Sequence, residues 1–203
     1  ESISLVQFNL NFNGFFYEPL QQIMPAVWWT MNQTADFVAN KYGISRQALD
    51  KYVVMSQGRV AAANAAGKYV EEIAPITTKM KVTDKATGQS SVVDVTLDRD
   101  EGPRPDTTYE RLAALKPVYE GGTTTAGNAS QLSDGAAACV LMDADLAAKR
   151  GLPILGYWRG FALGSVAPEE MSIAITPAIR KLMVQNAVNA DDVDLWELHE
   201  AYA

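Results

Sequence analysis

The strongest constraint on the fold is a run of small residues, Gly121-Gly122-Thr123-Thr124-Thr125-Ala126-Gly127-Asn128-Ala129-Ser130. Backbone without bulky side chains can approach a ligand or another strand closely, so a buried loop of this kind predicts a site of close contact. Residues 133–138 then predict a tight turn or short helix. The apolar residues 139–142 predict a fully buried strand.

The rest of the chain alternates helical and strand patterns. Apolar spacing, capping residues and closing glycines predict helices at 34–43, 45–66, 109–115, 143–150 and 176–187. β-Leaning runs predict strands at 76–82 and 91–97, joined as a hairpin, and further strands are expected at 154–162 and 193–198. Residues 1–29 show no clean period and are interpreted as loop with irregular turns, whose aromatic residues cover a ligand or partner, or pack onto the core.

Composition excludes several classes of protein. The net charge of -7, from 17 basic and 24 acidic residues, speaks against a nucleic-acid partner. A single cysteine excludes an internal disulfide and favours a reducing compartment. No apolar run reaches the roughly 18 residues of a membrane span. The start on Glu1, without a signal-peptide pattern, predicts that the true N-terminus lies elsewhere.

The end of the chain carries a candidate site. The strand expected at 193–198 runs directly into His199-Glu200-Ala201-Tyr202-Ala203, and α/β proteins place site residues at the carboxyl ends of strands. His199 is the only histidine. Cys139, by contrast, lies in an apolar run without a basic neighbour, so we expect a buried, inert structural cysteine.

Two blocks of sequence resemble the thiolase family. Residues 125–138 resemble its T-A-G-N-A-S-x-L-x-D-G-A-A-A block, and residues 196–203 are similar to its W-E-x-N-E-A-F-A block, at the family's spacing. Shorter supporting matches lie at 31–35, 42–46, 56–57, 72–75 and 100–108. The resemblance is colinear over almost the whole chain.

This resemblance implies the α/β thiolase fold, in which two similar halves stack in five layers, α-β-α-β-α. A loop domain is inserted in the first half. Residues 1–122 would be this loop domain, residues 123–150 the return strand and helix of the N-terminal half, and residues 151–203 the start of the C-terminal half.

The resemblance also implies acyl-CoA acyltransferase chemistry, with coenzyme A as substrate, no covalently bound cofactor and no metal. A nucleophilic cysteine forms an acyl-enzyme; that cysteine, the acid/base cysteine and the G-H-P histidine would lie outside this chain. Degradative 3-ketoacyl-CoA thiolase is the first expectation, from residues 104–108 and His199. The alternatives are a biosynthetic acetoacetyl-CoA thiolase and a non-catalytic CoA- or lipid-binding protein.

Individual site residues follow by position in the matched blocks. His199 occupies the oxyanion-hole position, where most members have Asn and hold a water, and Tyr202 replaces the usual Phe of the pocket wall. The residues matched to CoA or acyl contacts are Ser130, Ala126, Gly127, Ala129, Tyr119, Arg104, Arg111 and Met31. Homodimers or homotetramers are implied. The expected location is intracellular, the bacterial cytoplasm first, with mitochondrion or peroxisome as alternatives.

Overall fold

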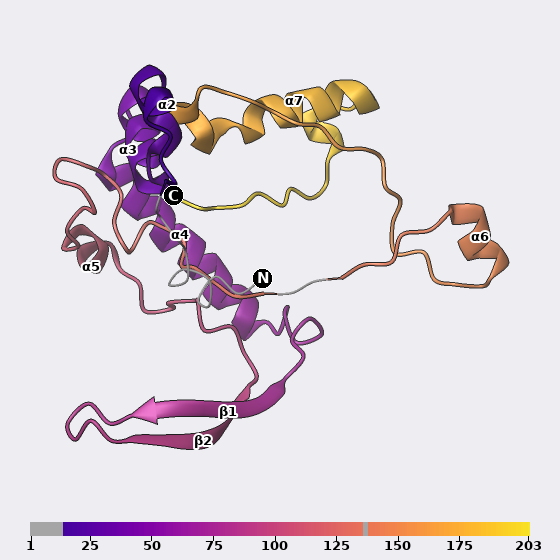
Figure 1. Ribbon diagram of the computed structural model, residues 1–203. Helices are drawn as coiled ribbons and strands as arrows, with labels where there is room; N and C mark the ends of the chain where they lie inside the picture. Colours follow the sequence, from indigo (N-terminus) through magenta and orange to yellow (C-terminus); the bar gives the residue numbers. More distant parts are fainter. Residues whose placement is uncertain (1–13, 136–137) are drawn as a thin grey trace. The chain divides into compact units, whose positions relative to one another are not determined.

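The structure is a computed structural model that describes residues 14–135 and 138–203. The chain divides into two compact units. The first unit comprises residues 1–46 and 116–202, and the second comprises residues 47–115 with Ala203. Figure 1 labels the α-helices and strands of both units. The boundaries at residues 122 and 150, expected from the thiolase resemblance, stay predictions.

The second unit contains a long helix, a hairpin and a short helix. Helix α4 (Arg46–Ala65) buries Leu49 and Val53, and α5 (Tyr109–Ala113) buries Leu112. Thr108 caps α5 because its Oγ1 accepts a hydrogen bond from the Arg111 N–H at 3.3 Å. The helices predicted at 45–66 and 109–115 are therefore confirmed.

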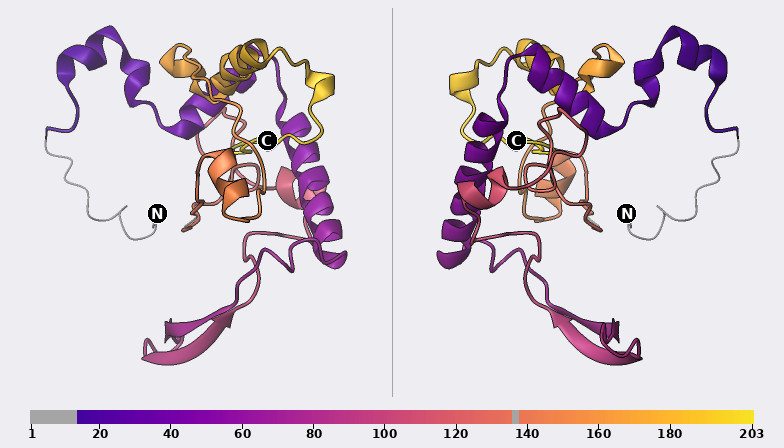
Figure 2. Two further views of the ribbon diagram at one scale, coloured as in Figure 1. Left: turned by 90° about the vertical axis from the view of Figure 1, so that its right-hand side faces the viewer. Right: turned by 90° about the vertical axis from the view of Figure 1, so that its left-hand side faces the viewer.

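The hairpin is set by its turn. Strands β1 (Ile76–Thr83) and β2 (Ser90–Leu97) pair antiparallel, with Ile76 opposite Leu97. Asp84 Oδ1 accepts the N–H groups of Ala86 at 2.7 Å and Thr87 at 3.2 Å, and Gly88 adopts φ +71. These local bonds close the turn, which confirms the predicted hairpin. Figure 2 shows it extending from the end of α4.

The first unit holds the remaining helices. They are α2 (Glu18–Ile23), η1 (Pro25–Trp28), α3 (Met31–Lys41), α6 (Ala144–Lys149), η2 (Pro168–Ile173), α7 (Ile175–Asn186) and η3 (Ala190–Asp192). The helices predicted at 34–43, 143–150 and 176–187 are confirmed. The opening is more regular than expected, because its described part contains α2 and η1. The rings of Phe15, Phe16 and Trp28 pack against one another, with centroids 5.1–5.7 Å apart.

Helix α3 is the best-defined element of this unit. It begins in a capping box, in which Thr30 and Gln33 satisfy each other's backbone N–H groups. It ends at Lys41, and the φ of +66 at Gly43 lets the Ile44 N–H reach the Ala39 carbonyl oxygen at 2.7 Å. One side is buried through Thr34, Ala35, Val38 and Ala39.

Three predicted strands are absent from the described residues. Residues 139–142, 154–162 and 193–198 run without strand pairing, and apolar side chains on them are highly exposed, such as Val140 at 90% and Leu155 at 99%. A strand needs a neighbouring strand for its backbone hydrogen bonds. The described residues supply such pairing only in the β1–β2 sheet and at one isolated bridge. The prediction of a buried strand at 139–142 is therefore wrong for this structure.

Candidate functional site

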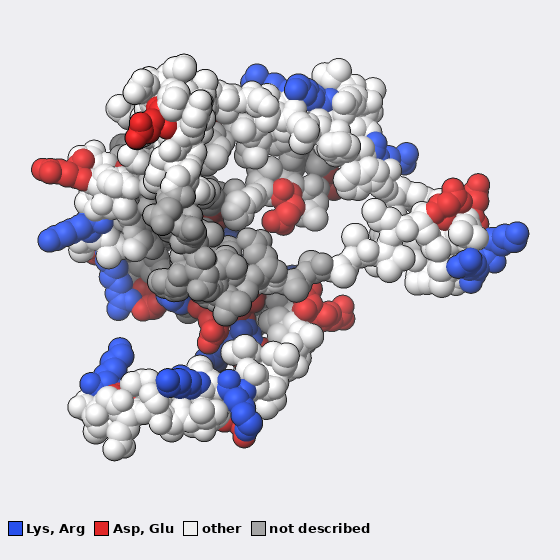
Figure 3. Space-filling model, viewed as in Figure 1, with Lys and Arg blue, Asp and Glu red and all other residues white. Residues whose placement is uncertain are grey.

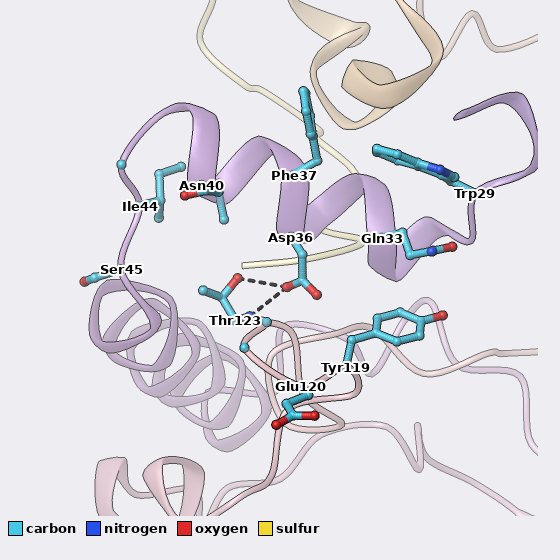
Figure 4. A pocket seen from close by; sticks show the side chains of 14 residues that line it. Trp29, Gln33, Asp36, Phe37, Asn40, Ile44, Ser45, Tyr119, Glu120 and Thr123 are labelled. Atoms are coloured by element: carbon cyan, nitrogen blue, oxygen red, sulfur yellow. Dashed lines mark hydrogen bonds between the residues drawn. The ribbon is translucent and has the colours of Figure 1, made fainter. Parts of the chain in front are cut away.

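The small-residue loop is anchored on α3 by one carboxylate. Asp36 Oδ1 accepts the N–H groups of Thr123 at 2.7 Å and Thr124 at 2.8 Å, and the Thr123 hydroxyl at 3.0 Å. Figure 4 shows Asp36 pointing from α3 to Thr123, and both residues line a cavity of about 700 Å³. A Cβ on Gly122 would overlap the Asp36 carboxylate and come within 3.1 Å of the Tyr119 carbonyl oxygen, so this close approach requires glycine.

The loop is also braced internally by Asn128. Its Oδ1 accepts the Thr125 N–H at 2.7 Å, and its Nδ2 donates to the Thr123 carbonyl oxygen at 3.0 Å. Thr124, Thr125 and Asn128 are only 2%, 0% and 3% exposed. These buried side-chain bonds to the backbone hold the turn together, so the loop has a defined shape.

The end of the chain meets this loop. Ala129 and Tyr202 form an antiparallel bridge, and the Ser130 N–H donates to the Ala201 carbonyl oxygen at 2.9 Å. The Tyr202 hydroxyl donates to Asn32 Oδ1 at 2.9 Å. The structure thus brings together the two blocks that stood out in the sequence, although some 70 residues separate them.

The start of α3 gathers further predicted residues. The hydroxyl of Tyr119 shares a hydrogen bond of 2.8 Å with the Thr30 hydroxyl, directly before Met31 in the chain. Met31 is 54% exposed at the first position of α3. Tyr202 reaches the next residue, Asn32. Three residues predicted to surround the acyl-CoA, Met31, Tyr119 and Tyr202, are therefore held at one helix end.

Other predicted contacts of the ligand lie on the open side of the loop. Ser130 and Ala126 are exposed, and Gly127 and Ala129 are half-buried. The Ser130 hydroxyl donates to the Gln131 carbonyl oxygen at 3.2 Å, a bond that exposed serines exchange readily for a ligand. His199 is exposed in an irregular segment, three residues before Tyr202.

The two predicted arginines lie in the second unit. Arg104 Nη1 donates to the Glu101 carbonyl oxygen at 2.8 Å, and its N–H donates to Gln57 Oε1 at 2.7 Å. Arg111 pairs with Asp106, and this contact lowers the pKa of the Asp106 carboxyl. The side chain of each arginine is thus bonded to residues close to it in the sequence, and a role toward a nucleotide stays a prediction.

Cys139 corrects another expectation. It is exposed rather than buried, because the segment around it has no covering strand among the described residues.

Other kinds of site were searched for among the described residues. Within residues 14–135 and 138–203, no group of three or more His, Cys, Asp or Glu side chains is placed to hold a metal. No helix among these residues is long and apolar enough to span a membrane. On the face drawn in Figure 3, basic and acidic side chains are interspersed.

Comparison with known proteins identifies the family of this chain. The family model for the thiolase N-terminal domain matches residues 20–145. The chain belongs to the thiolase family. The peroxisomal 3-ketoacyl-CoA thiolase 1 of Petunia hybrida is 44% identical over 174 residues. The peroxisomal 3-ketoacyl-CoA thiolase A of Mus musculus is 41% identical over the same length.

A solved thiolase structure agrees with this membership. The dimeric peroxisomal thiolase of Saccharomyces cerevisiae matches 100% of this chain with a TM-score of 0.83 and 32% sequence identity. The α/β thiolase fold expected from the sequence is therefore confirmed for this segment. The chain covers 49% of that structure, and 37% and 40% of the Petunia and mouse thiolases.

Asn32 and Asp36 are the site residues that do not stand out in the sequence. Both are single polar residues in a helix, a pattern typical of a solvated surface. Their spacing of four residues places them on one helix face, and Asn32 also lies in the supporting match at 31–35. The structure shows them half-buried and bonded to segments far along the chain.

Proposed function

We propose that this protein is an acyl-CoA acyltransferase of the thiolase type, which cleaves 3-ketoacyl-CoA to acetyl-CoA and a shortened acyl-CoA or runs the reverse condensation. The observation that supports this most is the bridge between Ala129 and Tyr202, with the Ser130 N–H bonded to Ala201. It joins the segment assigned to pantetheine with the segment assigned to the oxyanion hole, as one active site requires.

The proposed roles follow from what each group offers. The small residues Ala126, Gly127 and Ala129 leave room for the pantetheine arm, and the exposed Ser130 supplies a hydroxyl for hydrogen bonding. His199 has a ring N–H that can replace the Asn-bound water as a donor to the thioester oxygen as it becomes negative. Met31, Tyr119 and Tyr202 would line the acyl side, and Arg104 or Arg111 would bind a phosphate of the nucleotide.

We propose that Cys139 is not the nucleophile of this reaction. A thiolase nucleophile needs a thiolate activated by a nearby base or cation. Cys139 has Ala138 and Val140 beside it in the sequence. The proposal therefore places the acyl-enzyme elsewhere, and it assigns this chain the binding of coenzyme A and one half of the oxyanion hole.

We further propose the degradative type, because the relatives matched are named 3-ketoacyl-CoA thiolases. Their names also carry the word peroxisomal, which favours a peroxisome and gives no support to the bacterial cytoplasm expected from the sequence. The yeast relative is titled dimeric, and we propose a homodimer for this protein as well.

The test uses the protein as its gene encodes it. Acetyl-CoA release is measured by chromatography with acetoacetyl-CoA and with medium- and long-chain 3-ketoacyl-CoA, each with free CoA. Thiolysis of the longer substrates supports the degradative type, whereas activity confined to acetoacetyl-CoA would favour the biosynthetic alternative. CoA binding without any turnover would favour a non-catalytic binding protein.

A further inference from the structure

The hydroxyl of Tyr202 takes no part in the chemistry proposed above, yet it forms a hydrogen bond within the protein. It donates to Asn32 Oδ1 at 2.9 Å, a contact between residues 170 positions apart. Burial, followed by the nearby Asp36 and Tyr119, raises the pKa of Tyr202. The hydroxyl therefore stays protonated, and able to donate, throughout the neutral range.

Asn32 shares its helix face with the loop anchor. Asn32 and Asp36 are one turn apart on α3, so their side chains leave the helix on the same side. Asp36 holds the loop at Thr123 and Thr124, whereas Asn32 holds the end of the chain at Tyr202. One rigid turn of helix thus carries both segments of the candidate site.

The backbone contacts alone do not prevent the segment that carries His199 from rotating. The Ala129–Tyr202 bridge and the bond from Ser130 to Ala201 set which residues face each other. A single isolated bridge does not stop the segment that carries His199 from rotating about it, because no regular ladder of the described residues continues on either side. The bond from the Tyr202 side chain to α3 adds the second fixed point.

We propose that Asn32 and Tyr202 form a positioning pair that holds the His199 segment in place beside the small-residue loop. The inference rests on the proposed function. Neither side chain needs to touch the reacting atoms; the pair acts by fixing the backbone from which His199 projects. A displacement of a catalytic donor lowers the rate without weakening substrate binding.

The test compares variants of the protein as its gene encodes it. Tyr202→Phe keeps the ring and removes only the hydroxyl. We expect kcat for thiolysis to fall about fivefold, the worth of one ordinary hydrogen bond, with KM for CoA nearly unchanged because the loop keeps its Asp36 anchor. Asn32→Ala should give the same fall, and the double variant should fall no further than either single variant. Asn32→Asp retains the acceptor oxygen and should restore kcat.

The matched control is Tyr42→Phe. Tyr42 follows α3 directly, and its hydroxyl donates to Glu170 Oε1 at 3.2 Å, so the variant loses the same kind of bond at the other end of the helix. We expect no change in kcat. An equal fall in Tyr42→Phe would overturn the positioning role, since it would show a general loosening of α3. Additive falls in Tyr202→Phe and Asn32→Ala would also overturn it.

A second readout does not depend on activity. Amide hydrogen exchange should rise in residues 199–203 of Tyr202→Phe, while residues 121–125 stay protected as in the wild type. Unchanged exchange at 199–203 would overturn the pair, whatever the kinetics. If the wild-type protein shows no thiolysis at all, the proposed function fails, and the exchange measurement still decides whether the pair fixes the segment.

Discussion

Replacement of Asp36 by alanine tests how the small-residue loop is held. The carboxylate is the single acceptor for the backbone N–H groups of Thr123 and Thr124. Thr124 is 2% exposed, so its N–H has little access to water that could replace the lost acceptor. Asp36→Ala therefore leaves the buried Thr124 N–H without its acceptor, which costs more than the loss of an exposed bond.

The magnitude follows from the number and kind of these bonds. A hydrogen bond to a charged group contributes about 1.5–3 kcal/mol, and two main-chain bonds would sum to about 3–6 kcal/mol. Thr123 is only half-buried, so water can replace part of its loss, which places the expectation at the lower end. We expect Asp36→Ala to lower the free energy of unfolding by about 3 kcal/mol.

Urea denaturation of the protein as its gene encodes it measures this change. Asp94→Ala is the matched control, because Asp94 pairs with Lys79 at 2.8 Å while both side chains are about 70% exposed. That exposed pair should contribute less than about 1 kcal/mol. Asp36→Asn keeps one acceptor oxygen and should fall between the two. A loss in Asp36→Ala no larger than in Asp94→Ala would refute the anchoring role.

Three further predictions concern the same unit. Thr124→Val should raise the free energy of unfolding by about 1 kcal/mol in urea denaturation, because the buried Thr124 Oγ1 has no partner among the described residues. Gly122→Ala should lower it by about 2 kcal/mol, since a Cβ would overlap Asp36. Lys41 lowers the pKa of Glu170, so the stability that Glu170 adds is present at neutral pH and lost as pH falls through this lowered pKa. The wild type and Glu170→Gln should therefore converge in acid melts.

A different result would contradict each of these three predictions. A destabilised Thr124→Val would show that its hydroxyl has a partner outside the described residues. Gly58→Ala is the control for Gly122→Ala, because Gly58 lies in α4 with open space at its Cβ position and the change should stabilise the helix. A stability difference between the wild type and Glu170→Gln that persists unchanged in acid would disprove the ion-pair explanation.

Locally determined elements were predictable from the sequence. The hairpin depends on Asp84 and Gly88 within its own turn, and α5 depends on its cap Thr108. Helix α3 begins and ends through neighbours within a few residues. Such bonds depend on adjacent residues, so the pattern of the chain carries the necessary information.

The strands predicted at 139–142, 154–162 and 193–198 are absent from the described residues, and the reason is physical. Apolar runs such as 139–142 and 193–198 are typical of buried strands, but burial and pairing require partners that the run itself does not specify. Without such partners among the described residues, these runs lie exposed, and Cys139 lies exposed with them. The apolar pattern indicates that these segments favour burial, but in this structure their side chains remain exposed.

Part of the candidate site could be predicted from the sequence, and part could not. The two blocks that meet at Ala129 and Tyr202 were recognisable because each is dense in unusual residues. The helix that holds both blocks, α3, could not be recognised from the sequence, because Asn32 and Asp36 act through contacts with residues 170 and 87 positions away. A long-range polar contact leaves no periodic trace in the sequence, so only the folded chain identifies the helix that organises the site.

The position of α3 couples three segments that the sequence keeps apart. Its first turn holds Tyr202, its middle holds Thr123, and its last turn holds Glu170 through Lys41 at 2.7 Å. A shift of the helix along its axis would move all three together, since each bond joins a side chain or backbone group directly to it. The bond of Lys41, whose side chain is 45% exposed, should tolerate loss, whereas the bonds of the half-buried Asn32 and Asp36 should not. The sensitivity of the site to substitution should therefore follow the burial of the contact on α3 and not its distance along the helix from His199.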